Sequence, residues 1–196
     1  MSETEPADNR GTVYRLLALL WAQELTRPTQ QLLSSNPVRE TWLSLGGTDP
    51  LPLEKRLDEL SEQFCRLFIG PVGHQPPIQS VWADGELQSE VSARLNEFAA
   101  CCDYESPWSD LLPDHLANEL QLMGLILEKV GLEDEPERVD AAADLAASFY
   151  ESHVRWAVEF TDRVATLDDG FYGRLAGITA NFLRLEEHSL RRVAEN

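Results

Sequence analysis

Apolar side chains recur at a helical spacing along most of this chain, and this periodicity constrains its fold more than any other feature. The clearest stripe lies in residues 53–67, where apolar residues recur at helical intervals with charged residues between them. Leucine, with 30 copies, outnumbers valine, threonine and isoleucine together, and no stretch alternates apolar with polar residues as a half-buried strand would. The pattern therefore favours helices over sheet. Further helices are predicted at residues 13–20, 38–45, 87–98, 116–130, 139–149, 154–167 and 171–185.

Two irregular stretches interrupt the stripes. Residues 70–82 contain prolines and glycines at too many interior positions for a helix, and their apolar content argues against disorder. A loop of that length in a compact helical domain is typically functional. Residues 102–113 also lack the stripe and contain two prolines and a tryptophan, so we expect a hinge there. Asp114 follows the hinge and is expected to cap the next helix through its side-chain oxygen.

These elements predict an all-α fold, a compact bundle of about eight to nine helices in a single domain over residues 10–196. The domain has two helical halves, residues 10–101 and 114–190, joined by the hinge. We expect residues 1–9 to be a disordered N-terminus, and Trp21, which has apolar neighbours on its helix, to lie in the core. A hinge with prolines also permits exchange of halves, so the sequence is compatible with a mixture of monomer and domain-swapped homodimer.

The chain is strongly acidic, with 34 acidic residues against 16 basic ones and a formal net charge of -18. Such a surface would repel a phosphate backbone, which argues against nucleic acids and anionic membranes as partners. The charge either serves solubility alone or attracts cationic partners, and composition leaves both open. The longest apolar run, residues 16–22, is too short to span a bilayer, and the first residues lack the features of a secretory signal. We therefore expect a cytoplasmic protein without stable membrane insertion.

Familiar catalytic constellations are missing from the sequence. No nucleophile elbow, phosphate loop, dinucleotide fingerprint or His-Glu-x-x-His motif occurs, and the spacing of the three cysteines suits neither a disulfide framework nor a zinc site. Of the four histidines, only His115 shares a helix face with a carboxylate, Glu119, at a spacing of four residues. We therefore expect a protein that binds and does not catalyse, with no metal and no cofactor. The alternatives are a metal-dependent helical hydrolase that uses His115 and Glu119, and an acidic adaptor for a folded basic protein.

The two irregular stretches each carry a tryptophan, Trp82 in the first and Trp108 in the second. Acidic residues follow both of them, with Asp84 after the first and Asp110 and Asp114 after the second. If both tryptophans face the surface, the stretches form an apolar groove with an acidic rim. Such a groove suits a peptide with arginines followed by an apolar stretch, because carboxylates pair with guanidinium groups and aromatic rings pack against leucines.

Several short motifs follow one another in a recognisable order. They are Phe64-Cys65-Arg66-Leu67-Phe68-Ile69-Gly70-Pro71, then Pro76-Pro77-Ile78-Gln79-Ser80-Val81-Trp82, then Pro113-Asp114-His115-Leu116 with Glu119-Leu120, then His153, Val154, Trp156 and Phe160, and last Phe171, Tyr172, Leu175 and Ala176. In this combination the chain resembles the TorD/DmsD/NarJ family of cytoplasmic redox-enzyme maturation chaperones, over roughly residues 10 to 190.

The resemblance implies an all-helical chaperone that binds the twin-arginine leader of a molybdopterin oxidoreductase, often one of the dimethyl sulfoxide or trimethylamine N-oxide reductase type. It would hold that enzyme back from export until the cofactor is inserted, so the implied partners are the signal peptide and the apo form of the catalytic subunit. The client stays unidentified, and no nucleotide is assigned because the chain lacks a phosphate-cradling loop. The family's leader-binding surface corresponds here to Phe64, Leu67, Phe68, Gly70, Pro71, Pro77, Ser80, Trp82, Asp114 and His115.

Overall fold

The computed structural model describes residues 9–87, 89–132 and 135–194. The predicted disordered N-terminus, residues 1–9, lies outside this description except for Asn9. The helical elements, in chain order, are α1 (Arg10–Ala22), α2 (Arg27–Ser34), α3 (Val38–Ser44), the 3-10 helix η1 (Leu51–Arg56), α4 (Leu57–Phe64), the π-helix η2 (Cys65–Ile69), α5 (Gln79–Asp84), α6 (Glu90–Cys101), α7 (Leu116–Leu132), α8 (Pro136–Phe149), the π-helix η3 (Tyr150–Val154), α9 (Trp156–Leu167) and α10 (Phe171–Ala194). No strand forms in the described ranges, so the predicted all-α class is confirmed.

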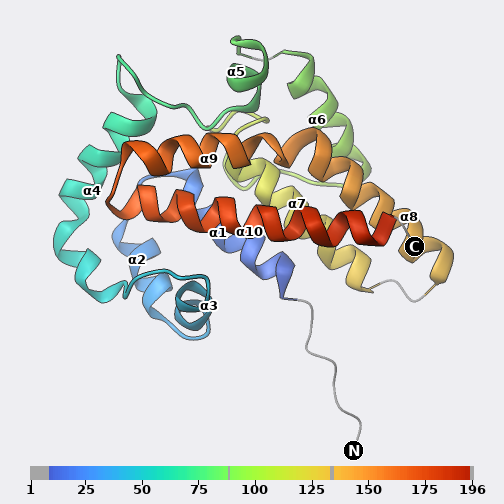
Figure 1. Cartoon of the computed structure of the whole chain (residues 1–196), viewed down its shortest axis with the longest axis horizontal. Helices are drawn as coiled ribbons and strands as arrows, with labels where there is room; N and C mark the ends of the chain where they lie inside the picture. The colour runs from blue at the N-terminus through green and yellow to red at the C-terminus, as the bar shows by residue number, and fades with distance from the viewer. Residues whose placement is uncertain (1–8, 88, 133–134, 195–196) are drawn as a thin grey trace, which may run out of the picture.

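The long helices are arranged in two packed pairs. Figure 1 shows α9 and α10 side by side across the molecule, with α8 continuing the line of α9, and α1 and α7 behind them. The most extensive helix contacts are those of α1 with α7 and of α9 with α10. A Cβ atom at Gly124 would lie 3.0 Å from the carbonyl oxygen of Gly11, so glycine at both positions lets α1 and α7 approach closely. Because α1 belongs to the first predicted half and α7 to the second, this helix pair joins the two halves.

The core is one cluster of buried apolar side chains drawn from both halves. Trp21 on α1 is only 1% exposed, which confirms its predicted core position. Its indole Nε1 donates a hydrogen bond to Thr179 Oγ1 on α10 at 3.0 Å. Its ring packs against Phe68 and Phe160, with ring centroids 5.6 and 5.3 Å apart. The two halves therefore share a single core around the α1 side chains.

One prediction about the first irregular stretch is wrong. Its last residues belong to a short helix, α5, which begins at Gln79 and ends at Asp84; the next residue, Gly85, has a φ of 73° and caps it. The helix begins there because Asp114 supplies its cap: the Asp114 carbonyl oxygen accepts the Gln79 N–H, and Asp114 Oδ2 accepts the Ser80 N–H, both at 2.9 Å. The expected role of Asp114 as a cap for the helix after it is corrected accordingly, since its carboxylate bonds to a helix earlier in the chain.

The sequence interpretation also missed α2. Its N-cap is Thr26, whose side chain accepts the Thr29 N–H at 3.4 Å, and Pro28 stands in its first turn. Both are ordinary helix-start signals. Within the described part of the chain, no helix has the length and apolar character needed to cross a bilayer.

Candidate functional site

The candidate site is a mostly apolar cavity of about 440 Å³. It lies where the end of α1, the junction of α4 with η2, the loop before α5 and the hinge come together. A cavity of this size falls in the usual range for ligand pockets, about 300 to 1,000 Å³. We call it the main cavity, and its lining residues are Ala22, Gln23, Glu24, Phe64, Cys65, Phe68, Ile69, Pro76, Pro77, Ile78, Asp110, Leu111 and His115.

One wall of the main cavity is the π-helical turn η2. Such turns are uncommon and occur frequently at functional sites. Phe64 and Phe68 pack edge to face with ring centroids 5.0 Å apart, and the Trp21 ring supports Phe68 from the core. Ile69 is 65% exposed, although it is apolar. A second, open hollow of about 580 Å³ shares Cys65 and Ile69 with the main cavity, so the apolar surface continues past this turn. The hollow is lined by Cys65, Arg66, Ile69, Gly70, Pro71 and Val72.

The opposite boundary is the loop that leads to α5, and backbone bonds hold it in place. The Gln75 N–H donates to the Leu67 carbonyl oxygen at 2.6 Å, and the Leu116 N–H donates to the Pro77 carbonyl oxygen at 2.8 Å. Ile78 pairs with His115 in an isolated antiparallel bridge. The loop is thus tied to both η2 and the start of α7, and its prolines form a fixed wall.

His115 brings a polar group to this apolar cavity, and its side chain is only 8% exposed. Its Nδ1 accepts the Ala117 N–H at 3.2 Å, so the ring proton of the neutral imidazole is on Nε2. Burial lowers the pKa of His115 to about 4, although the charges of Asp114 and Asp110 act in the opposite direction. His115 is therefore an uncharged hydrogen-bond donor at neutral pH.

Behind the loop, a buried polar cluster joins α5 to the helices beneath it. Gln79 Nε2 donates to the Ser152 carbonyl oxygen at 2.6 Å, and Gln79 Oε1 lies 3.0 Å from His153 Nδ1. Trp156 Nε1 donates to Glu119 Oε2 at 2.7 Å. Burial holds the pKa of the Glu119 carboxyl well above its usual range, the Trp156 N–H opposes this rise and the Asp114 charge adds to it. The Gln79 bonds fix α5 on η3, and the Trp156 bond links α9 to α7 next to it.

Glu119→Gln is expected to raise the free energy of unfolding at pH 7.5, because the amide keeps an acceptor for the Trp156 N–H and cannot ionise. The unfolded carboxyl releases its proton near pH 4.5, whereas the folded one keeps it to higher pH, so wild-type stability falls as the pH rises through that interval. The gain of the variant over wild type should therefore grow from pH 4.5 to pH 7.5 in urea denaturation. Glu159→Gln, at an exposed position of α9, serves as the control. A stability difference that is the same at both pH values contradicts a protonated Glu119.

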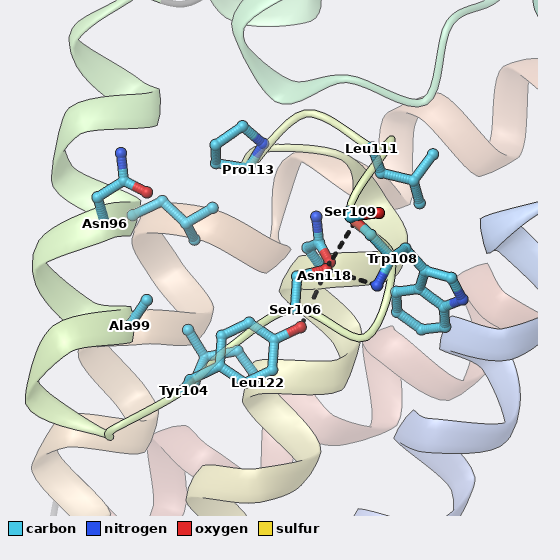
Figure 2. A pocket seen from close by; sticks show the side chains of 11 residues that line it. Asn96, Ala99, Tyr104, Ser106, Trp108, Ser109, Leu111, Pro113, Asn118 and Leu122 are labelled. Carbon is cyan, nitrogen blue, oxygen red and sulfur yellow. Dashed lines mark hydrogen bonds between the residues drawn. The ribbon is translucent and has the colours of Figure 1, made fainter.

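One side chain of α7, Asn118, makes three hydrogen bonds to the hinge. Its Oδ1 accepts the Ser106 hydroxyl at 2.6 Å and the Tyr104 hydroxyl at 3.3 Å, and its Nδ2 donates to the Leu112 carbonyl oxygen at 2.8 Å. Figure 2 shows Tyr104, Ser106 and Asn118 together; all three line a smaller cavity of about 210 Å³, which Trp108 also lines. Leu111 contributes to both this cavity and the main one. The hinge is therefore an ordered wall between two cavities, and no sequence motif had pointed to Asn118.

The structure places nine of the ten predicted site residues in three groups. Four of them, Phe64, Phe68, Pro77 and His115, line the main cavity, and two more, Gly70 and Pro71, line the adjoining hollow. The buried residues Leu67, Ser80 and Asp114 lie behind these walls.

Trp82 is half-buried and lines neither space. It donates from Nε1 to the Pro76 carbonyl oxygen at 3.0 Å, and its ring lies 6.5 Å from that of Trp156 and 5.5 Å from that of Phe160. It therefore supports the loop wall from behind. The other lining residues of the main cavity, Glu24 and Ile69 among them, were not predicted as site residues from the sequence. Ile69 is inside a quoted motif, whereas Glu24 follows α1 with no pattern around it.

The geometry does not favour the metal-dependent hydrolase. Across the ranges that the structure describes, no three His, Cys, Asp or Glu side chains are placed to hold one metal ion. Glu119 is fully buried and accepts the Trp156 N–H, and His115 Nδ1 accepts a backbone N–H. One atom of each proposed ligand therefore already has another partner.

Comparisons with known proteins agree on one group. A family model described as nitrate reductase delta subunit matches residues 30–162. Chaperone protein TorD of Shewanella oneidensis is 24% identical, with 98% of this chain and 95% of that protein covered. Chaperone protein YcdY of Escherichia coli is 30% identical, with 70% and 72% covered. In fold, a candidate redox enzyme maturation protein from Archaeoglobus fulgidus superimposes with a TM-score of 0.61 at 18% identity, covering 93% of this chain and 98% of that one.

Proposed function

The chain belongs to the nitrate reductase delta subunit family, and from that membership we propose that it is a chaperone for the maturation of a molybdopterin oxidoreductase. More specifically, it binds the twin-arginine leader of the apo catalytic subunit, in the cytoplasm, and holds the subunit until its cofactor is inserted. The client is of the dimethyl sulfoxide or trimethylamine N-oxide reductase type. The chain acts by binding and is not an enzyme. The observation that carries this proposal is the main cavity, with its apolar walls and acidic rim.

The shape of the apolar surface supports a peptide as the ligand. The main cavity and the adjoining hollow share Cys65 and Ile69, so they form one continuous surface that passes over the η2 turn. Ile69 and Val72 are 65% and 87% exposed on it. Exposed apolar side chains gathered at one place are typical of surfaces that bind partners. A chain segment with several apolar side chains can cover both spaces, which a compact small molecule cannot.

The energetics favour apolar contact as the main source of affinity. A micromolar complex corresponds to about -8 kcal/mol. Exposed pairs of arginine and carboxylate supply only about 0.2 to 1 kcal/mol each. Two such pairs cannot account for a complex of that strength, so the apolar stretch of the leader must supply most of it. The acidic rim then contributes association rate and preference for cationic peptides.

Calorimetric titration tests the proposal. The chain is titrated with a synthetic twin-arginine leader peptide and with a scrambled peptide of the same composition and charge. We expect the leader to bind at least about tenfold more tightly, because only its sequence places the apolar stretch directly after the arginines. Equal, weak binding of both peptides would contradict leader recognition and would leave the net charge of -18 as the sole source of attraction. That result would favour the alternative that the chain is an acidic adaptor for a folded basic protein.

A further inference from the structure

The two charged residues among those that line the main cavity are both acidic, Glu24 and Asp110. They come from different segments, since Glu24 follows α1 and Asp110 belongs to the hinge. Neither carboxylate forms an ion pair or a hydrogen bond with another described residue. Elsewhere, acidic side chains such as Glu128 and Glu187 do pair with arginines of the chain. The cavity thus presents two carboxylates whose partners the described chain does not supply.

From this arrangement we propose that Glu24 and Asp110 accept the two leader arginines, one guanidinium at each carboxylate. The inference rests on the proposed function and assigns the cationic end of the ligand to two named residues. Phe64, Phe68 and Ile78 line the same space and would take the apolar residues that follow. Contact with apolar walls excludes water, which strengthens a charge-assisted hydrogen bond. The carboxylates and the aromatic wall therefore fix the direction in which the peptide lies.

A second observation indicates that the ligand is a peptide. His115 lines the same cavity, and no described residue accepts a hydrogen bond from its Nε2–H. Its side chain is 8% exposed, so few water molecules reach this donor, and a ligand atom in the cavity can accept its proton. A peptide carbonyl oxygen provides that acceptor, whereas a free polyamine provides cations without one. The cavity therefore fits a ligand with cations, a backbone carbonyl and apolar side chains together.

The proposal also distinguishes arginine from lysine. A guanidinium is planar and can bond to both oxygens of one carboxylate, whereas an ammonium group acts as a compact point charge. A leader with Lys-Lys in place of Arg-Arg keeps the net charge and loses the two-point geometry. We expect it to bind about three- to tenfold more weakly than the natural pair.

The test is a double-mutant cycle between the chain and the peptide. Glu24→Gln and Asp110→Asn are each titrated with the Arg-Arg leader and with a Gln-Gln version. We expect each variant to bind the Arg-Arg leader about three- to tenfold more weakly than the wild-type chain does. The affinity for the Gln-Gln leader should change by less than about twofold. Glu40→Gln on α3 and Glu105→Gln in the hinge remove the same charge from exposed positions outside the cavity, and are expected to change affinity less than about twofold. Thermal unfolding of all four variants checks that the fold is retained.

The outcomes separate this inference from the proposed function. Suppose that the wild-type chain prefers the leader to a scrambled peptide, but the cavity variants lose no more affinity for the leader than the control variants do. The assignment of Glu24 and Asp110 is then overturned and leader recognition stands. The assignment is also overturned if both peptides lose affinity equally on a carboxylate variant, because the loss then does not depend on the arginines. If the wild-type chain shows no preference for the leader over a scrambled peptide, both the inference and the proposed function fail.

Discussion

Replacing Ile69 with aspartate is expected to weaken leader binding by at least about 30-fold, while the free energy of unfolding changes by less than about 0.5 kcal/mol. Ile69 is 65% exposed, so the folded chain loses little packing when this side chain is removed. In the complex, however, the new carboxylate would lie where the main cavity meets the adjoining hollow, and bound apolar residues would strip it of water. Calorimetry measures the affinity and urea denaturation measures the stability.

Leu185→Asp is the matched control for this experiment. Leu185 is 68% exposed on α10 and lines neither the main cavity nor the hollow, yet its replacement adds the same negative charge. Added negative charge favours association with a cationic peptide, so electrostatics alone predicts a slight gain for both variants. A loss confined to Ile69→Asp identifies apolar contact at this surface. Equal affinities for the two variants would place the leader elsewhere on the chain.

Trp21→Ala is expected to lower the free energy of unfolding by about 3 to 5 kcal/mol, the usual cost of removing a large buried aromatic side chain. The indole is 1% exposed and packs between Phe68 and Phe160. Its removal leaves a cavity directly behind Phe68, a lining residue of the site. Leader affinity should therefore fall as well, under conditions where the variant is still folded, because Phe68 loses its support. Urea denaturation and calorimetry on the same sample measure both effects.

The comparison variant for the core is Trp108→Ala, which removes a half-buried tryptophan from the hinge. Its loss should cost clearly less, about 1 to 2 kcal/mol, because part of the ring is already in water. If Trp108→Ala destabilises the chain as much as Trp21→Ala, the core is not centred on α1. If Trp21→Ala costs stability but leaves leader affinity intact, Phe68 does not depend on the indole for its place.

The spacing of apolar residues in the sequence predicted the long helices, because these depend on residues close together in the chain. The stripe in residues 116–130 corresponds to α7, because a long amphipathic helix follows from spacing alone. The helix that Asp114 caps was predicted wrongly, because this cap depends on a residue far away in the chain. Capping rules consider the next few residues, whereas the Ser80 N–H that Asp114 accepts is 34 residues away in the chain. A partner brought in by tertiary packing cannot be found from spacing.

The candidate site likewise contains residues that a sequence motif identified and residues that only tertiary packing places there. Phe64 and Phe68 could be singled out because they belong to a recognisable motif, and both line the cavity. Trp82 was expected beside them, but its ring packs against Trp156 and Phe160 of α9 instead. Glu24 was missed because its position depends on how α1 lies in the bundle. The sequence therefore predicts the kind of surface better than the residues that form its rim.

The close pairing of α1 with α7 has a consequence for how the chain is made. Arg15 on α1 bonds to Glu128 on α7 at 2.8 Å, and these residues are 113 positions apart. At a synthesis rate of about 5 to 20 residues per second, Arg15 is added to the chain roughly 6 to 23 seconds before Glu128. During that interval the apolar face of α1 has no native partner and can associate with other nascent chains. The α1 segment would therefore itself need shielding from other chains while the rest of the protein is being synthesised.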